Sequence, residues 1–395
     1  MTASDFWAFG NGITFLNHGS FGACPVPVLE RRERLLRQIE LDPMGFMLGD
    51  YQPLRCSALE VLTEFTGAEK DSLVFVENCT AGINTILRNI PVMPGEGILV
   101  TDQEYFSSMN ALREIAGRKG AVVQLINLPF PVSDQEEILE AVVAAIAPET
   151  RFALIDHVVS STGMVLPLKK IIDLFSDFGI KTIVDGAHGP GEVPLDLKNL
   201  GCMAYAGNCH KWLCSPRSSA VLYVNPEFQR NFLPLVISHV PSDFDTELSD
   251  YQLYFSWNGT PDPTPALCVP CSIDFMAALH PEGWQGVMDS NRELALKARE
   301  ILCSATGAEP VCPESMVGAM AAVPLEWYTP EVSREPDWID PLQKWLKQEK
   351  GIVVPVTDLK GSKAKMIRLS AQMYNTIHQY HFLAEALVEF RNLRY

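Results

Sequence analysis

The chain has 395 residues, of which 47% are hydrophobic and 20% charged, a composition that fits a large globular domain with a smaller one beside it. Its formal net charge of −17 and its pI near 4.9 argue against binding to nucleic acid or to an anionic membrane, because both require a basic face. Since the first residues lack a signal-peptide pattern and no apolar run approaches membrane-spanning length, we expect a cytoplasmic protein with reduced cysteines.

The first part of the chain alternates irregular segments with amphipathic helices. Residues 1–25 show no period and end in a glycine-rich turn. Leucines and charges at helical spacing predict helices from Val26 to Glu40 and from Leu54 to Gly67, with a loop from Asp42 to Gly49 between them. We treat residues 1–52 as an N-terminal segment.

Residues 53–265 show strand–helix alternation, which is typical of a parallel sheet with helices on its faces. Short apolar runs predict seven strands: Leu73 to Val76, Ile98 to Thr101, Val122 to Ile126, Phe152 to Ile155, Lys181 to Val184, Met203 to Ala206 and Ala220 to Val224. Helices are predicted between several of them, at Ala81 to Asn89, Ser107 to Arg118, Ser133 to Ala147 and Lys169 to Phe178. The fold class is therefore α/β.

Residues 266–395 predict a smaller α+β domain. A polar surface loop, Leu233 to Tyr254, precedes it. Thr264 to Leu279 and Trp284 to Ser304 have helical patterns. The remaining predicted elements are strands at Gly318 to Pro324, Ile352 to Pro355 and Met366 to Ser370, and helices at Trp338 to Glu349 and Ile377 to Leu393.

The most informative stretch runs from Ile183 to Tyr223. Asp185 stands where a buried strand stops, and Lys211 follows the next apolar run. Open α/β sheets bind ligands at the carboxyl ends of their strands, so both side chains are expected at a binding edge. Taken singly, the acid would be a turn or helix cap and the lysine would be solvated. Their pairing, with His188 and His210 beside them, favours a functional site.

One cofactor accounts for this pair. Pyridoxal phosphate (PLP) needs a lysine for a Schiff base and an acidic partner for its pyridinium nitrogen. A carboxylate beside that nitrogen favours the protonated ring, because opposite charges stabilise each other. The pair Asp185 and Lys211 therefore predicts a PLP site.

Several motifs, in the same order along the chain, are similar to those of the class V aminotransferase family of PLP fold type I. They are Leu-Asn-His-Gly-Ser-Phe-Gly from Leu16, Asn-Cys-Thr-Ala-Gly-Ile-Asn-Thr from Asn78, Thr-Asp-Gln-Glu-Tyr from Thr101, His-Val-Val-Ser-Ser-Thr-Gly from His157, Asp-Gly-Ala-His from Asp185, Asn-Cys-His-Lys-Trp from Asn208 and Asn-Gly-Thr-Pro from Asn258. The resemblance covers nearly the whole chain and is strongest to the branch of isopenicillin N epimerases and C–S lyases.

The resemblance implies a fold-type-I large domain with a mostly parallel seven-stranded sheet, a smaller C-terminal α+β domain and PLP as cofactor. It makes Lys211 the Schiff-base lysine and general base, and Asp185 the partner of the pyridinium. His188 would approach the phenolic oxygen of PLP, and Tyr105 would stack on its ring. Ser160 stands where the wider family commonly has an Asn that approaches the same oxygen.

The phosphate group of PLP would lie at a helix N-terminus. Thr80 and Ala81 lie between the first predicted strand and the next helix, whose free backbone N–H groups and dipole favour an anion. By resemblance, Cys79 occupies a position that is often Thr. By resemblance, Asn208 and His210 complete the phosphate cup. Thr260 matches a residue that reaches the phosphate cup across a dimer interface in relatives, which implies a homodimer with shared active sites. The N-terminal segment is expected to pack on the dimer and on the active site.

Substrate contacts are also implied by the resemblance. Arg368 precedes Met-Tyr-Asn and matches the family's carboxylate-binding arginine, whose guanidinium can grip a carboxylate with two hydrogen bonds. Asn17 and His18 are expected at the entrance of the site.

The reaction is less defined than the cofactor. Epimerisation at Cα of an amino acid is the leading hypothesis, a C–S lyase of the cysteine desulfhydrase or cysteine-conjugate β-lyase type is the alternative, and transamination is less favoured. A cysteine desulfurase needs a nucleophilic cysteine on a loop shortly before the carboxylate-binding arginine. Residues 313–395 contain no cysteine, which argues against this activity. A single C-x-x-C, Cys268 and Cys271, opens an apolar stretch, so we interpret both as core residues and predict no metal site.

Overall fold

The structure is a computed structural model that describes residues 3–238, 248–330 and 339–394. Its N-terminal part contains η1 (Ala3–Phe6), β1 (Thr14–Phe15), α1 (His18–Phe21), α2 (Val26–Leu41), α3 (Pro43–Gly45), η2 (Phe46–Asp50) and α4 (Tyr51–Thr66). Strands and helices then alternate: β2 (Leu73–Val76), α5 (Cys79–Asn89), β3 (Gly97–Thr101), α6 (Phe106–Lys119), β4 (Val122–Ile126), α7 (Gln135–Ala145), β5 (Thr150–Asp156), α8 (Leu168–Asp177), β6 (Lys181–Asp185), α9 (Leu197–Leu200), β7 (Ala204–Asn208), β8 (Ala220–Val224), η3 (Pro226–Phe228) and α10 (Asp250–Tyr254).

The C-terminal part follows with α11 (Thr264–Leu267), α12 (Val269–Ala277), α13 (Gly283–Thr306), η4 (Glu314–Met316), β9 (Met320–Leu325), α14 (Pro341–Lys350), β10 (Ile352–Val353), β11 (Val356–Asp358), β12 (Lys365–Ser370) and α15 (Ile377–Arg394). Trp338, the predicted first residue of the helix now seen as α14, lies outside the described residues, as does part of the predicted loop from Leu233 to Tyr254. The end of that predicted loop is helical, as α10.

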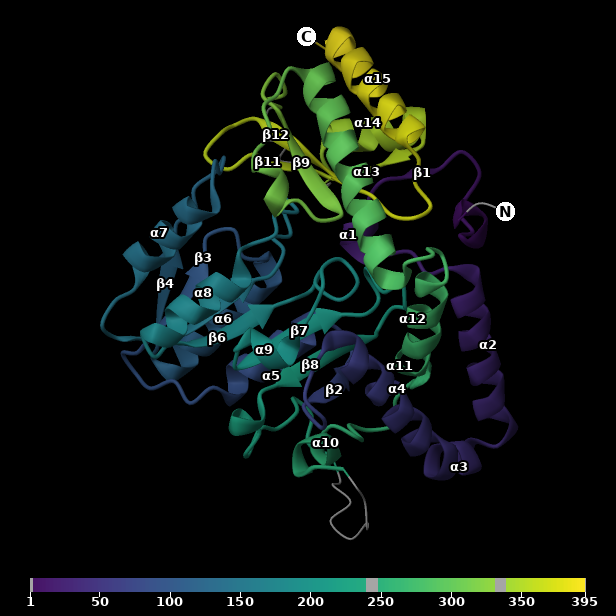
Figure 1. Ribbon diagram of the computed structural model, residues 1–395, viewed down its shortest axis with the longest axis vertical. Coiled ribbons are helices and arrows are strands. Elements are labelled where there is room, and N and C mark those ends of the chain that lie inside the picture. Colours follow the sequence, from purple (N-terminus) through teal and green to yellow (C-terminus); the bar gives the residue numbers. More distant parts are fainter. Residues whose placement is uncertain (1–2, 239–247, 331–338, 395) are drawn as a thin grey trace.

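The large unit is built on a seven-stranded sheet in the order β2-β8-β7-β6-β5-β3-β4. β8 is antiparallel to both of its neighbours, and the pairs from β7 to β4 are all parallel. All seven predicted strands are present, and the predicted fold class is confirmed. Figure 1 shows this sheet at one end of the molecule and α13, α14 and α15 at the other.

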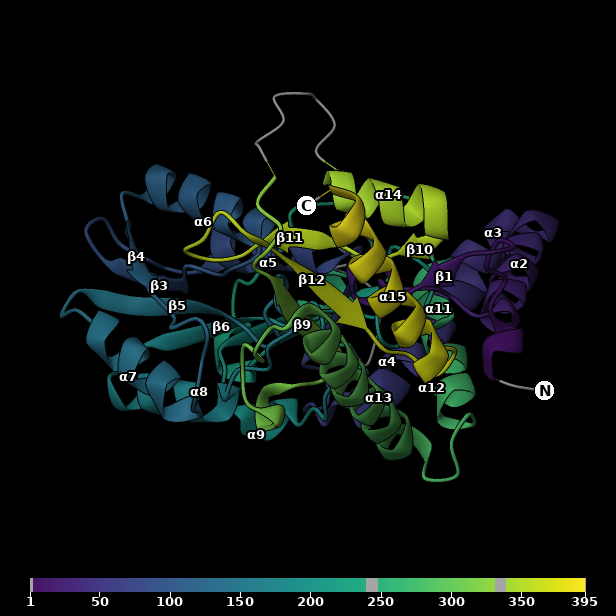
Figure 2. The ribbon, with the colours of Figure 1, turned by 90° about the horizontal axis from the view of Figure 1, so that it is seen from above.

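Helices cover both faces of this sheet, which explains why its strands are apolar almost throughout. On one face, Ile98 and Val100 pack in a cluster with Ile83 of α5 and Leu112 of α6. On the other face, alternate residues such as Leu99 pack in the main core with residues of α4, α7 and α8. The view from above shows α6 and α7 on opposite sides of the strands (Figure 2).

Strand register brings Asp185 and Lys211 to the same edge of the large sheet. In the parallel pair β6–β7, Asp185 lies opposite Ala206. Asp185 ends β6, and Lys211 follows the end of β7 by three residues. The turns after both strands therefore leave the sheet at the same carboxyl edge, as the sequence predicts.

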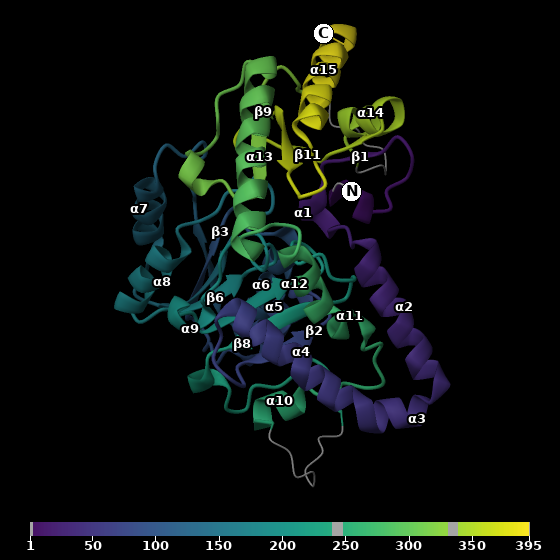
Figure 3. The ribbon, with the colours of Figure 1, turned by 45° about the vertical axis from the view of Figure 1, so that its right-hand side comes forward.

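The smaller unit consists of the antiparallel sheet β11-β12-β9 with α13, α14 and α15 against it. The N-terminal segment joins it, because β1 pairs in parallel with β10. Beyond this pairing, α2 runs down the side of the molecule beside α11 and α12, and α3 lies at its lower end (Figure 3). The division at residues 52 and 265 stays a prediction.

The prediction of a loop from Asp42 to Gly49 is wrong, because α3 and η2 occupy these residues. The Asp42 carboxylate caps this segment by accepting a hydrogen bond from the Gly45 N–H at 2.9 Å. Phe46 is buried in a cluster with Val28 and Leu35, which fixes the segment on α2. Within the described ranges, every helix is too short or too polar to cross a bilayer.

Candidate active site

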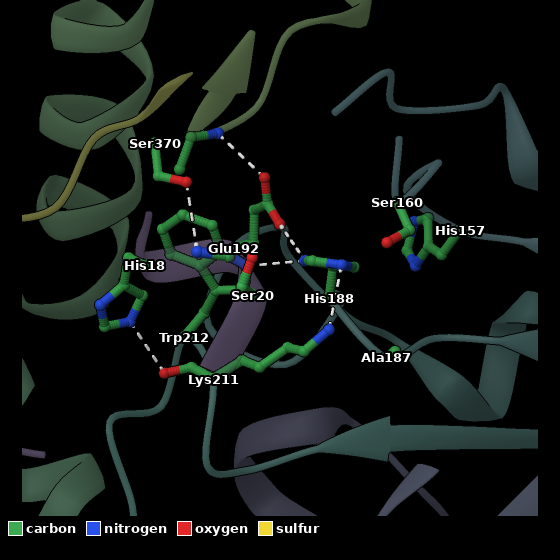
Figure 4. A network of polar contacts seen from close by, with 12 residues as sticks. His18, Ser20, His157, Ser160, Ala187, His188, Glu192, Lys211, Trp212 and Ser370 are labelled. Carbon is green, nitrogen blue, oxygen red and sulfur yellow. Dashed lines mark hydrogen bonds and ion pairs between the residues drawn. The ribbon is translucent and has the colours of Figure 1, made fainter. Parts of the chain in front are cut away.

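Lys211 lies on the segment after β7, and three parts of the chain meet at it. Its carbonyl oxygen accepts a hydrogen bond from Nε2 of His18 at 2.9 Å, and its Nζ lies 3.1 Å from Nε2 of His188 (Figure 4). Gly22 has a φ of +69°, and a Cβ there would lie 2.1 Å from the carbonyl oxygen of His210. This close approach requires a glycine and packs the Asn-His-Gly-Ser-Phe-Gly turn against the lysine.

The amine of Lys211 is enclosed although the residue as a whole keeps some exposure. Burial lowers the pKa of this amine to about 8, and the positive charge of Arg368 adds to the effect. Asp185 acts in the opposite direction. About one tenth of the amine is therefore unprotonated at pH 7, compared with less than one thousandth for an ordinary lysine.

Asp185 is buried, with hydrogen-bond donors on both carboxylate oxygens. The Ser108 hydroxyl donates to Oδ2 at 2.6 Å, and the Cys79 thiol and the Ala187 N–H donate to Oδ1 at 3.3 and 3.1 Å. Donors on both oxygens favour the charged form of a carboxylate. Asp185 thus has the surroundings of an anion that could face a cationic ring.

Two further buried carboxyl groups, Glu104 and Asp156, lie behind Asp185. One oxygen from each of the three side chains falls within 4.8 Å of the others. Burial first, and then the neighbouring negative charges, raise the pKa of Glu104 and of Asp156 well above the usual range. Three adjacent buried anions would repel one another, so the raised pKa values favour the protonated forms of Glu104 and Asp156.

The predicted phosphate-binding residues meet at the N-terminus of α5. Asn208 accepts a hydrogen bond from the Cys79 N–H at 2.8 Å, which ties the end of β7 to the start of the helix. Thr80 is exposed there, and the Ser107 hydroxyl donates to its hydroxyl at 3.4 Å. The Ala81 N–H is held by the N-cap residue Asn78, and the Cys79 thiol turns to Asp185. Among the residues predicted to bind phosphate at this helix end, Thr80 is therefore the one whose hydroxyl faces outward.

The other predicted residues of the cup lie further apart. The His210 ring is close to the lysine in sequence, and its Nδ1 lies 2.9 Å from the carbonyl oxygen of Ser219. Thr260 is exposed, on the segment between α10 and α11. Its exposure is compatible with a role toward a second subunit.

Arg368 projects from β12 and is buried. Its guanidinium donates to the carbonyl oxygen of Ser160, to Oδ1 of Asn17 at 3.2 Å and to Oγ of Ser20 at 2.9 Å. Burial lowers its pKa to about 10, so it remains charged. Among the described residues no carboxylate forms a salt bridge with it, and its Nε has no hydrogen-bond partner. A buried cation without an anion is a natural position for a substrate carboxylate.

A cavity of about 480 Å³ opens in front of Arg368. Tyr105, which is 46% exposed, Ser160 and Ser20 also line it. Asn17 borders this region through Arg368, but His18 is fully buried behind Lys211, with its Nδ1 2.9 Å from the Tyr374 hydroxyl. The position of His18 differs from the predicted one at an entrance, because its ring is committed to this internal hydrogen-bonding network.

Several residues of the site were not singled out from the sequence. Ser20, Glu104, Ser108, Asp156 and Glu192 all contact the predicted residues. Glu104 directly precedes Tyr105, and Ser108 lies three residues after it in a predicted helix. Polar residues next to a motif residue could therefore have been recognised from the sequence as candidates for the site. Glu192 lies in a loop whose burial depends on the tertiary fold.

The fold and site define a class of protein. The chain superposes on C-DES, in a mutant with glycine covalently linked to its PLP cofactor, with a TM-score of 0.82 at 17% sequence identity, covering 98% of this chain and 100% of that one. This likeness identifies PLP fold type I.

The sequence comparisons place the chain more narrowly. The family model Aminotransferase class-V matches residues 57–327, and the chain belongs to this family. It is 34% identical over 391 residues to an isopenicillin N epimerase from Amycolatopsis lactamdurans, with 95% of each chain covered. It is 28% identical to a probable chloroplastic L-cysteine desulfhydrase from Arabidopsis thaliana, covering 94% of this chain and 82% of that one.

Proposed function

We propose that this chain is a PLP-dependent enzyme that acts at Cα of an amino-acid substrate, as an epimerase of the isopenicillin N epimerase type. Family membership and the two relatives support PLP chemistry. The residues present also fit the cofactor: a buried lysine, a buried carboxylate and a helix N-terminus with an exposed hydroxyl lie around one sheet edge. Bound there, PLP supplies an acceptor for the electrons released when a bond at Cα breaks.

Each of these residues would have a defined task. Lys211 would hold the cofactor through its aldehyde, and its amine, once freed by the substrate, would take the Cα proton. General bases of this kind typically contribute about 10²–10⁴-fold in rate. Asp185 would keep the ring nitrogen protonated, and Thr80 would donate to the phosphate.

The observation that carries the proposal is the unpaired charge of Arg368. Its guanidinium is buried, lacks a salt bridge among the described residues and lies near enough to Lys211 to lower the pKa of the amine. An α-carboxylate bound there would neutralise the charge and place Cα of the amino acid toward the lysine.

A C–S lyase of the cysteine desulfhydrase or cysteine-conjugate β-lyase type is the second candidate. The similarity to a probable L-cysteine desulfhydrase supports it, because both activities begin with removal of the Cα proton. After that step an epimerase returns the proton to the opposite face, whereas a lyase expels the sulfur substituent. Groups that can approach from the cavity, such as Tyr105, would decide between these outcomes.

A product assay tests the proposal. Purified holoenzyme is incubated with acylated amino acids, L-cysteine and cysteine S-conjugates, and the products are separated by chiral chromatography. Inversion at Cα with an intact carbon skeleton supports the epimerase. Pyruvate with ammonia and a thiol or sulfide identifies a lyase, and a keto acid formed only with a second amino acceptor identifies an aminotransferase.

The assembly and the cellular location belong to the same proposal. A homodimer with shared sites is supported by the match of the Asn-Gly-Thr-Pro segment and by the exposure of Thr260. A cytoplasmic location is supported by the ten cysteines, which are all free in the structure, because free thiols are typical of a reducing compartment.

A further inference from the structure

Two buried groups without a task in the proposed reaction, Trp212 and Glu192, both face the ring of His188 (Figure 4). The indole Nε1 of Trp212 lies 3.3 Å from Nδ1 of His188. Oε2 of Glu192 lies 3.7 Å from the same Nδ1. The opposite ring nitrogen, Nε2, is the one 3.1 Å from Nζ of Lys211.

The indole contact determines where the imidazole proton lies. An indole N–H can only donate a hydrogen bond, so Nδ1 of His188 must be the acceptor. A neutral imidazole carries its proton on the nitrogen that does not accept, which here is Nε2. Burial lowers the pKa of His188 well below its usual value, with Lys211, Arg368 and His18 adding to the effect, so the ring is neutral. The Nε2–H therefore points at the nitrogen of Lys211.

Glu192 fits this arrangement only in its protonated form. Its Oε1 accepts a hydrogen bond from the Ala319 N–H at 3.1 Å, and its Oε2 has no hydrogen-bond partner. A carboxylate at Oε2 would place a negative charge against the lone pair of Nδ1, whereas a carboxylic acid avoids this repulsion. Arg368 and Lys211 favour ionisation, but burial outweighs them and raises the pKa of Glu192 to about 8.

We propose that Trp212 and protonated Glu192 are positioning residues that hold His188 with its proton on Nε2, so that His188 donates a hydrogen bond to the nitrogen of Lys211. A donor facing the lysine nitrogen opposes its protonation and fixes the direction of its lone pair. This tautomer follows from the indole contact together with the neutral state that burial gives the ring, and only its catalytic consequence rests on the proposed function.

The test is nitrogen NMR of the full-length protein labelled with ¹⁵N-histidine, recorded near neutral pH with and without PLP. The His188 signals are assigned by their loss in His188→Gln. We expect Nε2 to carry the proton and Nδ1 to resonate as an unprotonated nitrogen. A wild-type protein with the proton on Nδ1, or on both nitrogens, would overturn the proposal whether or not the enzyme turns out to be an epimerase.

Variants separate the two positioning residues. Glu192→Gln keeps a neutral group beside Nδ1 and an acceptor for the Ala319 N–H, so Nε2 should stay protonated. The double variant Trp212→Phe/Glu192→Met removes the indole donor and the carboxylic acid, and a second His188 signal with Nδ1 protonated should appear. Trp284→Phe is a matched control, because the Trp284 indole donates to the carbonyl oxygen of Ile273 instead. An unchanged tautomer in the double variant would show that neither residue determines it.

Discussion

The ionisable residues of the site differ in charge because their immediate contacts differ. Asp185 has donors on both oxygens, whereas Glu104 and Asp156 each keep a buried oxygen without a partner. Burial without donors disfavours the anion, and donors favour it. The cluster can therefore present one negative charge, on the residue at the end of β6.

Replacing Asp185 by Asn should leave PLP bound but slow turnover. A nearby carboxylate typically shifts the pKa of its partner by roughly 1–3 units. Each unit corresponds to a factor of about ten. We therefore expect kcat to fall roughly 10²-fold in Asp185→Asn, measured by steady-state kinetics at saturating PLP. Ser108→Ala removes only one donor to Asp185 and should lose much less, and equal losses in both variants would contradict this assignment of the charge.

Glu104 should make stability depend on pH. Its pKa is raised above the ordinary value of 4.5, so the protonated group stabilises the folded state fully below pH 4.5. This stabilisation is lost as pH rises toward the raised pKa, because the unfolded chain then binds fewer protons. Glu104→Gln has no proton to lose, so its free energy of unfolding relative to wild type should rise with pH. Urea unfolding across this range measures it, and a pH-independent difference would show that Glu104 is ionised in the folded protein.

At the scale of elements, the start of α5 links the sheet to the predicted phosphate site. Asn78 is its N-cap, and its side chain accepts a hydrogen bond from the Ala81 N–H at 2.8 Å. Asn208 holds the Cys79 N–H from the end of β7. The two side-chain amides therefore fix the direction of the helix N-terminus.

Asn78→Ala should destabilise the protein by about 1 kcal/mol, the usual loss for removing an N-cap. It should also weaken PLP binding, because a frayed first turn no longer holds the exposed Thr80 at the helix N-terminus, where its hydroxyl would donate to the phosphate. Chemical denaturation and PLP titration of the apoprotein measure the two effects. Asn225→Ala, which removes a cap from the short helix η3, is a control that should leave PLP affinity unchanged. Equal effects on PLP affinity would contradict the role of α5.

The elements also show what the sequence can reveal. Buried apolar runs such as Ile98 to Thr101 predict strands because both sheet faces are covered, and residues at strand ends such as Asp185 then fall at one edge. The helical turn at Pro43–Gly45 was missed because Pro and Gly indicate a loop, while the deciding contact is the Asp42 cap. The protonation of Glu192 depends on its burial and on Ala319, Arg368 and Lys211, which only the folded chain brings together.

At the scale of the whole molecule, the candidate site lies between the carboxyl edge of the large sheet and the sheet of the smaller unit. Arg368 comes from β12, while Lys211 and Asp185 come from the segments after β7 and at the end of β6. The N-terminal turn with Asn17 and Ser20 bridges the two through Arg368. A relative movement of the two units would therefore change the distance between the carboxylate site and the lysine.

The shared-site homodimer can be tested by subunit mixing. If Thr260 serves the phosphate of the other subunit, a mixed dimer of Lys211→Ala and Thr260→Ala chains has one site with both lesions and one with neither. Activity should recover toward half of the wild-type value per mixed dimer, measured after subunit exchange. Mixed dimers, verified by differently tagged chains, that stay at the parental level would assign Thr260 to its own chain or to no site.

The central claim, that Lys211 carries PLP, is tested most directly by borohydride reduction of the purified holoenzyme followed by peptide mass mapping. We predict that the cofactor becomes fixed to the peptide containing Lys211 at nearly one equivalent per chain, and that Lys211→Ala releases its PLP on denaturation after the same treatment. Fixation at full stoichiometry in Lys211→Ala, or labelling of another lysine in the wild-type protein, would contradict it.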